Sequence, residues 1–127
     1  MKKIAIFGSG SGSNAENICV FFDSLPDIQI VLIGTNKKNS FIVTRAKKLE
    51  IPVLVFSKLE LNNFDDLHQK LTEKGVEYII LAGFLLKLPE KMIKEYSNKI
   101  INLHPSLLPK YGGRGMYGNN VHKAVLD

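Results

Sequence analysis

An asparagine and a histidine form the pair in this sequence best suited to chemistry. Asn102 and His104 stand two positions apart in IINLHPSLLPK, at the end of an apolar run. Residues two apart in a strand project from the same face, and Pro105 keeps His104 out of helical geometry. The amide N–H can donate to an oxygen that gains negative charge, and the imidazole can move a proton near neutral pH. Either residue alone is better explained by turn capping or a backbone hydrogen bond. Together with the loop described next, the pair favours catalysis.

A stretch rich in glycine and serine follows the first apolar run. FGSGSGSNAENI, residues 7–18, leads through Gly12, Ser13 and Asn14 into a helical pattern. Glycine allows positive φ and a close approach of backbone to a bound group, and a helix N-terminus favours negative charge. Ser13 and Glu16 have the spacing of a capping box. The stretch predicts a phosphate cradle, with a glycine turn that binds nothing as the alternative.

The two commonest phosphate-binding motifs do not fit this stretch. The P-loop signature with its lysine is absent. A dinucleotide fingerprint counted from Gly8 places Ser13 where the third glycine belongs, and GTNKKN replaces the acidic residue expected after the second strand. A dinucleotide oxidoreductase is therefore disfavoured.

Apolar runs alternate with helical patterns along the chain. We expect strands at 3–7, 28–35, 52–56, 76–84 and 99–104, and helices at 14–25, 40–50, 63–75, 89–97 and 119–127. This alternation predicts the α/β class, a Rossmann-like parallel sheet with helices on both faces, in a single domain 1–127. The glycine stretch, the asparagine–histidine pair and LAGFLLKL, residues 81–88, should meet at the carboxyl edge of the sheet. The expected last helix stops without a cap, so we expect the domain to be incomplete at its C-terminus.

Composition narrows the class of protein and its partners. The chain has 127 residues, 45% of them hydrophobic, and a net charge of +5. Its lysines are scattered, so we expect small anionic molecules as partners, and no nucleic acid and no membrane. Cys19, the single cysteine, lies in an apolar stripe, which predicts a buried thiol and fits a reducing, cytoplasmic location. No cysteine–histidine cluster has ligand spacing, so we expect no metal.

Three segments together resemble a known enzyme family. GSGSN after the first strand, LAGF at the fourth and NLHPSLLPKY at the fifth are similar to the phosphoribosylglycinamide formyltransferases, the folate-dependent formyltransferases of purine synthesis. The resemblance extends from the first strand to about Tyr111. It implies transfer of a formyl group from 10-formyltetrahydrofolate to the amine of glycinamide ribonucleotide, without a metal. The alternatives are another folate-dependent formyl-group enzyme, since HPSLLP is common to the wider group, and a non-catalytic phosphate-binding module of Rossmann-like fold.

The resemblance also implies a role for particular positions. The segment at 85–88 would otherwise be taken as ordinary packing at a sheet edge. The implied roles are phosphate binding by Gly12, Ser13 and Asn14, a pterin pocket lined by Leu85, Leu86, Lys87 and Leu88, an oxyanion held by Asn102, and proton transfer by His104.

The sequence also departs from the family pattern. A basic residue that often contacts the folate falls near Leu61, and a glycine-rich stretch at 112–118 containing Arg114 replaces a short turn. The family's catalytic aspartate would lie downstream of Asp127. We therefore expect this chain alone to have little or no transfer activity, and a homo-oligomer is allowed.

Overall fold

The structure is a computed structural model, and it describes residues 1–103. His104, the stretch 112–118 and the helix expected at 119–127 lie outside the described residues. The described elements are β1 (Lys2–Phe7), α1 (Ser13–Asp23), β2 (Ile28–Thr35), α2 (Phe41–Lys48), β3 (Val53–Val55), α3 (Lys58–Asn62), α4 (Phe64–Glu73), β4 (Tyr78–Ala82), α5 (Glu90–Glu95) and β5 (Ile100–Leu103).

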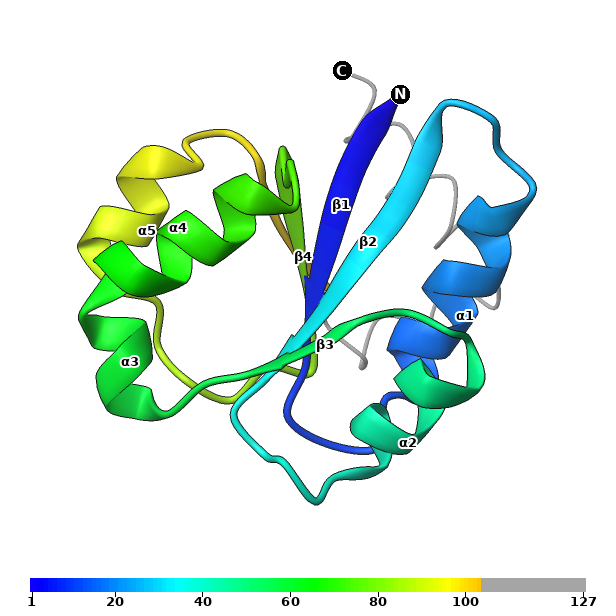
Figure 1. Cartoon of the computed structure of the whole chain (residues 1–127), viewed down its shortest axis with the longest axis horizontal. Coiled ribbons are helices and arrows are strands. Elements are labelled where there is room, and N and C mark those ends of the chain that lie inside the picture. The colour runs from blue at the N-terminus through cyan, green and yellow to red at the C-terminus, as the bar shows by residue number, and fades with distance from the viewer. Residues whose placement is uncertain (104–127) are drawn as a thin grey trace.

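The strands form one parallel sheet in the order β3-β2-β1-β4-β5, as Figure 1 shows. Its central strand, β1, is buried on both faces, with Ile4 to Phe7 each 0% exposed. A strand without a polar face needs helices on both sides of the sheet, as the run of apolar residues predicted. The α/β, Rossmann-like class is confirmed.

Two apolar cores lie on the two faces of the sheet. Ile4 and Ile6 pack with α1 and α2, whereas Ala5 and Phe7 pack with α3, α4 and α5. Figure 1 shows the same division, with α1 and α2 on one side of the sheet and the other three helices opposite. Alternate residues of one strand thus serve different cores, which is the period-two geometry of a strand.

Helix α3 was not predicted from the sequence. Ser57 caps it by accepting a hydrogen bond from Glu60 N at 3.0 Å, and the Glu60 carboxylate accepts one from Ser57 N at 2.9 Å. These bonds hold the pKa of Glu60 below its usual value, chiefly through the Ser57 backbone. Ser57-x-x-Glu60 is a capping box with the same spacing as the one that the sequence suggested at Ser13.

The strand order creates a switch point between β1 and β4. From β1 the chain proceeds through α1 to β2 on one side, and it returns with β4 on the other side of β1. The loops that follow β1 and β4 therefore leave the sheet toward opposite faces (Figure 1). Ligands of open α/β sheets bind in the crevice outside the carboxyl ends of the strands at such a point.

Candidate functional site

The loop after β1 reaches α1 through a backbone conformation that requires glycine. We call residues 8–14 the anion loop. Gly12 has φ +76°, and a Cβ there would lie 2.7 Å from Cα of Ile42. Ile42 N also donates to the carbonyl oxygen of Gly10 at 3.2 Å. The start of α2 thus presses directly on the anion loop, which leaves no room for a side chain at Gly12.

The prediction of a capping box at Ser13 and Glu16 is wrong. Gly12, not Ser13, is the N-cap of α1, and no side chain among residues 1–103 caps this helix. Within the same residues, Ser13 N has only a long contact of 3.4 Å with Ser11 Oγ. The first amide groups of α1 therefore remain available to an anion, and the helix dipole favours negative charge there.

Arg45 of α2 explains why Glu16 does not close a capping box. Its Nη1 lies 3.0 Å from Glu16 Oε1, and its Nε donates to the carbonyl oxygen of Ser11 at 2.7 Å. One guanidinium group thus binds both the carboxylate and the backbone of the anion loop. Such a fork of donors is specific to arginine.

The segment after β4, residues 83–88, faces the opposite side of the switch point. The Phe84 ring lies 5.5 Å from that of Phe7 and 5.9 Å from that of Phe56, so it anchors the segment to the core. Leu86 and Leu88 also pack on this core, whereas Leu85 is 75% exposed. An exposed leucine held between anchored neighbours provides an apolar contact surface.

Asn102 lies in β5 at the same edge of the sheet. It pairs in register with Leu81, which pairs in turn with Phe7. Ile101 and Leu103 pack on the core of α1 and α2, so alternation turns Asn102 toward the face of the 83–88 segment. Its side chain is exposed. The carboxyl edge thus brings together the anion loop, the 83–88 segment and Asn102, whereas His104 lies outside the described residues.

Three further residues belong to this edge and were not singled out from the sequence: Ser9, Asn36 and Arg45. Ser9 is 4% exposed, and its hydroxyl contacts Asn36 and the backbone of Leu85 from the neighbouring loops. No sequence signal marks Ser9 for contacts 27 and 76 residues away.

Two residues away from this edge, Leu61 and His68, have structural roles. Leu61, near which the resemblance implies a basic residue, is 0% exposed in the core, so its side chain is not available to a ligand. His68 stacks on Phe64 at 5.3 Å, and its Nε2 lies 3.7 Å from Glu95 Oε2. Within residues 1–103 no group of three or more histidine, cysteine or acidic side chains has a metal-binding arrangement, and no helix is long and apolar enough to cross a membrane.

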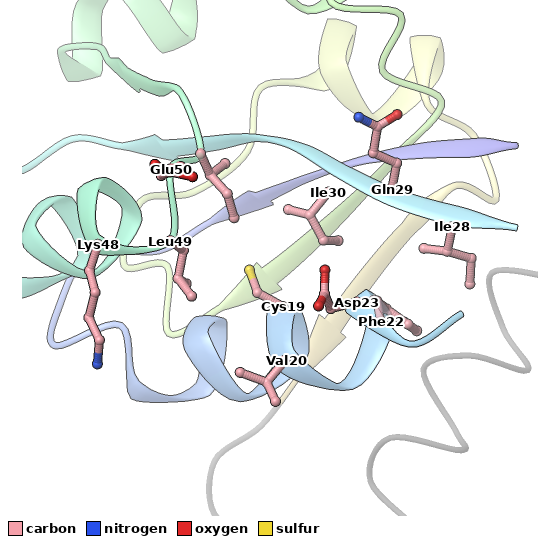
Figure 2. A pocket seen from close by; sticks show the side chains of 11 residues that line it. Cys19, Val20, Phe22, Asp23, Ile28, Gln29, Ile30, Lys48, Leu49 and Glu50 are labelled. Atoms are coloured by element: carbon pink, nitrogen blue, oxygen red, sulfur yellow. The ribbon is translucent and has the colours of Figure 1, made fainter. Parts of the chain in front are cut away.

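A pocket of about 560 Å³ lies at the other end of the sheet. Figure 2 shows residues from α1, from the start of β2 and from the turn after α2 around it, including Cys19, Ile30 and Leu49. Cys19 is buried there as a free thiol, as expected, and burial raises its pKa to about 12. The thiol is therefore protonated and inert at neutral pH. None of the predicted site residues lines this pocket.

The parallel sheet and the switch point define a Rossmann-like α/β protein, and the uncapped glycine loop makes its carboxyl edge the candidate site. The sequence profile of the formyl transferase family matches residues 2–127, and the chain belongs to that family.

Relatives support this assignment at high coverage of the chain. Phosphoribosylglycinamide formyltransferase of Arabidopsis thaliana chloroplasts is 40% identical over 99% of this chain and 45% of the plant protein. The Haemophilus influenzae phosphoribosylglycinamide formyltransferase is 37% identical over 99% of this chain and 65% of its own length. The crystal structure of the Anaplasma phagocytophilum phosphoribosylglycinamide formyltransferase has a TM-score of 0.75 and 32% identity, over 97% of this chain and 58% of that one. The chain thus spans from under half to about two thirds of these proteins.

Proposed function

We propose that the protein transfers a formyl group from 10-formyltetrahydrofolate to the amine of glycinamide ribonucleotide, a step of de novo purine biosynthesis. The observation that supports this most is the convergence of the anion loop, the 83–88 segment and Asn102 at one sheet edge of a formyl transferase family member. Relatives named for this reaction support the choice of substrate. We also propose a cytoplasmic location, which the buried free thiol of Cys19 supports.

The anion loop suits the phosphate of the ribonucleotide. Gly12, Ser13 and Asn14 supply amide groups at a helix N-terminus that no side chain caps. Gly12 gives the loop the left-handed backbone that leads into α1, and Arg45 lies behind the loop and adds positive charge. Each of these features favours a bound dianion over a neutral ligand.

The 83–88 segment suits a flat heterocycle such as a pterin. Among residues 1–103, the backbone amide groups of Leu86 and Lys87 have no hydrogen-bond partner, so they can bind the polar edge of a ring. The exposed Leu85 supplies apolar contact beside them. The residues present thus fit a folate, which would supply the formyl group.

Asn102 is placed to act on the formyl oxygen. When the substrate amine bonds to the formyl carbon, that oxygen becomes negatively charged, and the Asn102 amide can donate to it. A preorganised donor of this kind is worth about 3–4 kcal/mol of barrier. His104, two residues further along the sequence, is proposed to move the proton that the amine loses to the folate nitrogen. The bond between the formyl carbon and that nitrogen breaks as the oxyanion collapses, and the folate leaves protonated.

Titration with ribonucleotide, followed by amide chemical shifts, tests the phosphate site. We expect the shifts to concentrate at Gly12, Ser13 and Asn14, and Asn14→Ala to weaken binding. Asn17→Ala is the matched control, because Asn17 is exposed on α1 outside the loop. Shifts that cluster elsewhere would exclude the anion loop as the phosphate site.

Turnover and folate binding test the transfer itself. In a version extended through the downstream aspartate that the family pattern implies, Asn102→Ala should lower kcat by about 10²–10³ with little change in ribonucleotide affinity, because its donor acts mainly on the developing charge. Asn62→Ala, at an exposed position of α3, is the control. Failure to bind any folate would instead favour the non-catalytic phosphate-binding module.

A further inference from the structure

The buried hydroxyl of Ser9 links the loops that follow three neighbouring strands. Its Oγ donates to Asn36 Oδ1, after β2, at 2.6 Å and accepts a hydrogen bond from Leu85 N, after β4, at 3.0 Å. Ser9 N also donates to the carbonyl oxygen of Gly83 at 3.2 Å. Ser9 itself belongs to the anion loop and is 4% exposed.

The direction of these hydrogen bonds is fixed by chemistry. The Leu85 amide can only donate, so the Ser9 oxygen must accept from it and direct its own proton to Asn36. The bonds therefore form a chain from Leu85 through Ser9 to Asn36, in which each polarises the next. At 4% exposure, water is a poor substitute for either bond of Ser9.

The two proposed binding segments are thus connected through one side chain. Between Ser9 and the helix start, Gly10 O is bound by Ile42 N and Ser11 O by Arg45 Nε, so the anion loop is held along its length. A shift of this loop would therefore displace Ser9 and, through its hydroxyl, the Leu85 backbone. In a reaction between two substrates, the relative position of their binding segments sets the distance between the reacting atoms.

We propose that Ser9 is a positioning residue that couples the two substrate sites, so that an anion at the anion loop orders the 83–88 segment and favours the folate. The coupling between the two substrates rests on the proposed function, whereas the hydrogen-bonded link through Ser9 does not. Ser9 touches neither substrate in this proposal, and it acts through Leu85.

Hydrogen exchange in the ligand-free chain tests the link, with Ser9→Ala as the variant. Exchange of the Leu85 amide should become about tenfold faster, the effect of losing one buried hydrogen bond. Thr35→Val is the matched control, because Thr35 is 0% exposed and, within residues 1–103, its hydroxyl accepts only from Lys37 N, in its own loop, at 3.1 Å. Equal exchange of Leu85 in wild type and Ser9→Ala would overturn the link.

Calorimetry tests the coupling with ribonucleotide and tetrahydrofolate, which has no formyl group to transfer. In wild type and Thr35→Val, saturating tetrahydrofolate should tighten ribonucleotide binding by about fivefold or more. In Ser9→Ala this factor should fall to within about twofold of unity, although each ligand still binds alone. If Ser9 had a purely structural role, Ser9→Ala would weaken binding of each ligand and leave the coupling factor unchanged, and that result would overturn the proposal. A wild-type protein without any coupling between the two ligands would overturn it as well.

Two further measurements separate the possible failures. If Ser9→Ala does not fold, Asn36→Ala removes the acceptor and keeps the Ser9 oxygen, and an undiminished coupling factor in it overturns the proposal. If wild type binds neither ligand, the proposed function fails. Inorganic phosphate is then the probe, and hydrogen exchange of the Leu85 amide is the measurement. The role of Ser9 is overturned if phosphate slows this exchange equally in wild type and in Asn36→Ala, or in neither protein.

Discussion

Four glycines at the carboxyl edge allow backbone strain and steric conflict to be measured separately. Gly10 has no positive φ, and within residues 1–103 no atom beyond its own chain neighbours lies within 4 Å of the point where a Cβ would stand, whereas Gly83 has φ +70° and similar open space. Gly8 has no positive φ, but a Cβ would lie 2.6 Å from Ile42 Cδ1 and 2.9 Å from Ala82 O. Gly12 combines φ +76° with contacts of 2.7 to 2.9 Å to Ile42. Single substitutions to alanine therefore give a two-by-two design.

The expected losses of unfolding free energy follow from these contacts. Gly10→Ala should be neutral or stabilising by about 0.4–1 kcal/mol, because alanine restricts the unfolded chain. Gly83→Ala should cost about 1–2 kcal/mol for a left-handed backbone. Gly8→Ala should cost about 1–3 kcal/mol for overpacking, because the Ala82 oxygen is backbone and cannot move freely. Gly12→Ala should cost about the sum of the Gly83→Ala and Gly8→Ala losses, roughly 2–5 kcal/mol. The free energy of unfolding of a typical domain is about 5–15 kcal/mol.

Urea unfolding of the four variants, followed by circular dichroism, measures these losses. The same variants can be titrated with phosphate, and Gly12→Ala should lose binding beyond what its stability explains. A Gly12→Ala protein as stable as Gly10→Ala would refute the reasoning, since it would mean that α2 does not press on the anion loop as described.

Three further predictions concern residues that support the site and the fold. Arg45→Ala should weaken phosphate binding about tenfold, and Lys48→Ala should have little effect. Lys48 Nζ lies 3.9 Å from the Glu16 carboxylate and makes no hydrogen bond to the loop backbone within residues 1–103. Equal losses of affinity in calorimetry would contradict this. Burial raises the pKa of Cys19 in the folded protein to about 12. The stability that this shift contributes is complete below the unfolded pKa of about 8.5 and is lost as pH rises toward the folded pKa. Cys19→Ala should therefore flatten the alkaline fall in unfolding free energy, by up to about 1.4 kcal/mol per pH unit. Ser57→Ala should cost about 1 kcal/mol by urea unfolding, and a loss no larger than that of Ser24→Ala would argue against the capping box.

The sheet could be predicted from the sequence because its signal is local. An apolar run such as KIAIF requires cover on both faces, and helical spacing between such runs leaves parallel crossovers as the simplest solution. The carboxyl edge as the place of the site followed from that fold alone. Roles for Asn102 and for Gly12 to Asn14 stay predictions, and their placement at this edge supports them.

The errors arose where a local pattern has two possible structural outcomes. Ser13-x-x-Glu16 and Ser57-x-x-Glu60 share one spacing, yet only the second forms a capping box. At the first, Arg45 binds the glutamate and Gly12 takes the cap position. Arg45 lies 29 residues from Glu16, so no window around the helix start contains this information.

The failed capping box has a consequence for binding. A side chain that caps a helix occupies one or two of the four free amide groups at its N-terminus, so it competes there with a bound phosphate. Arg45 removes Glu16 from the helix N-terminus and adds a positive charge behind the loop with the same guanidinium group. Its loss should therefore do more than remove a charge. It should free Glu16 to cap α1, and the double variant Arg45→Ala with Glu16→Ala should recover part of the phosphate affinity that Arg45→Ala loses.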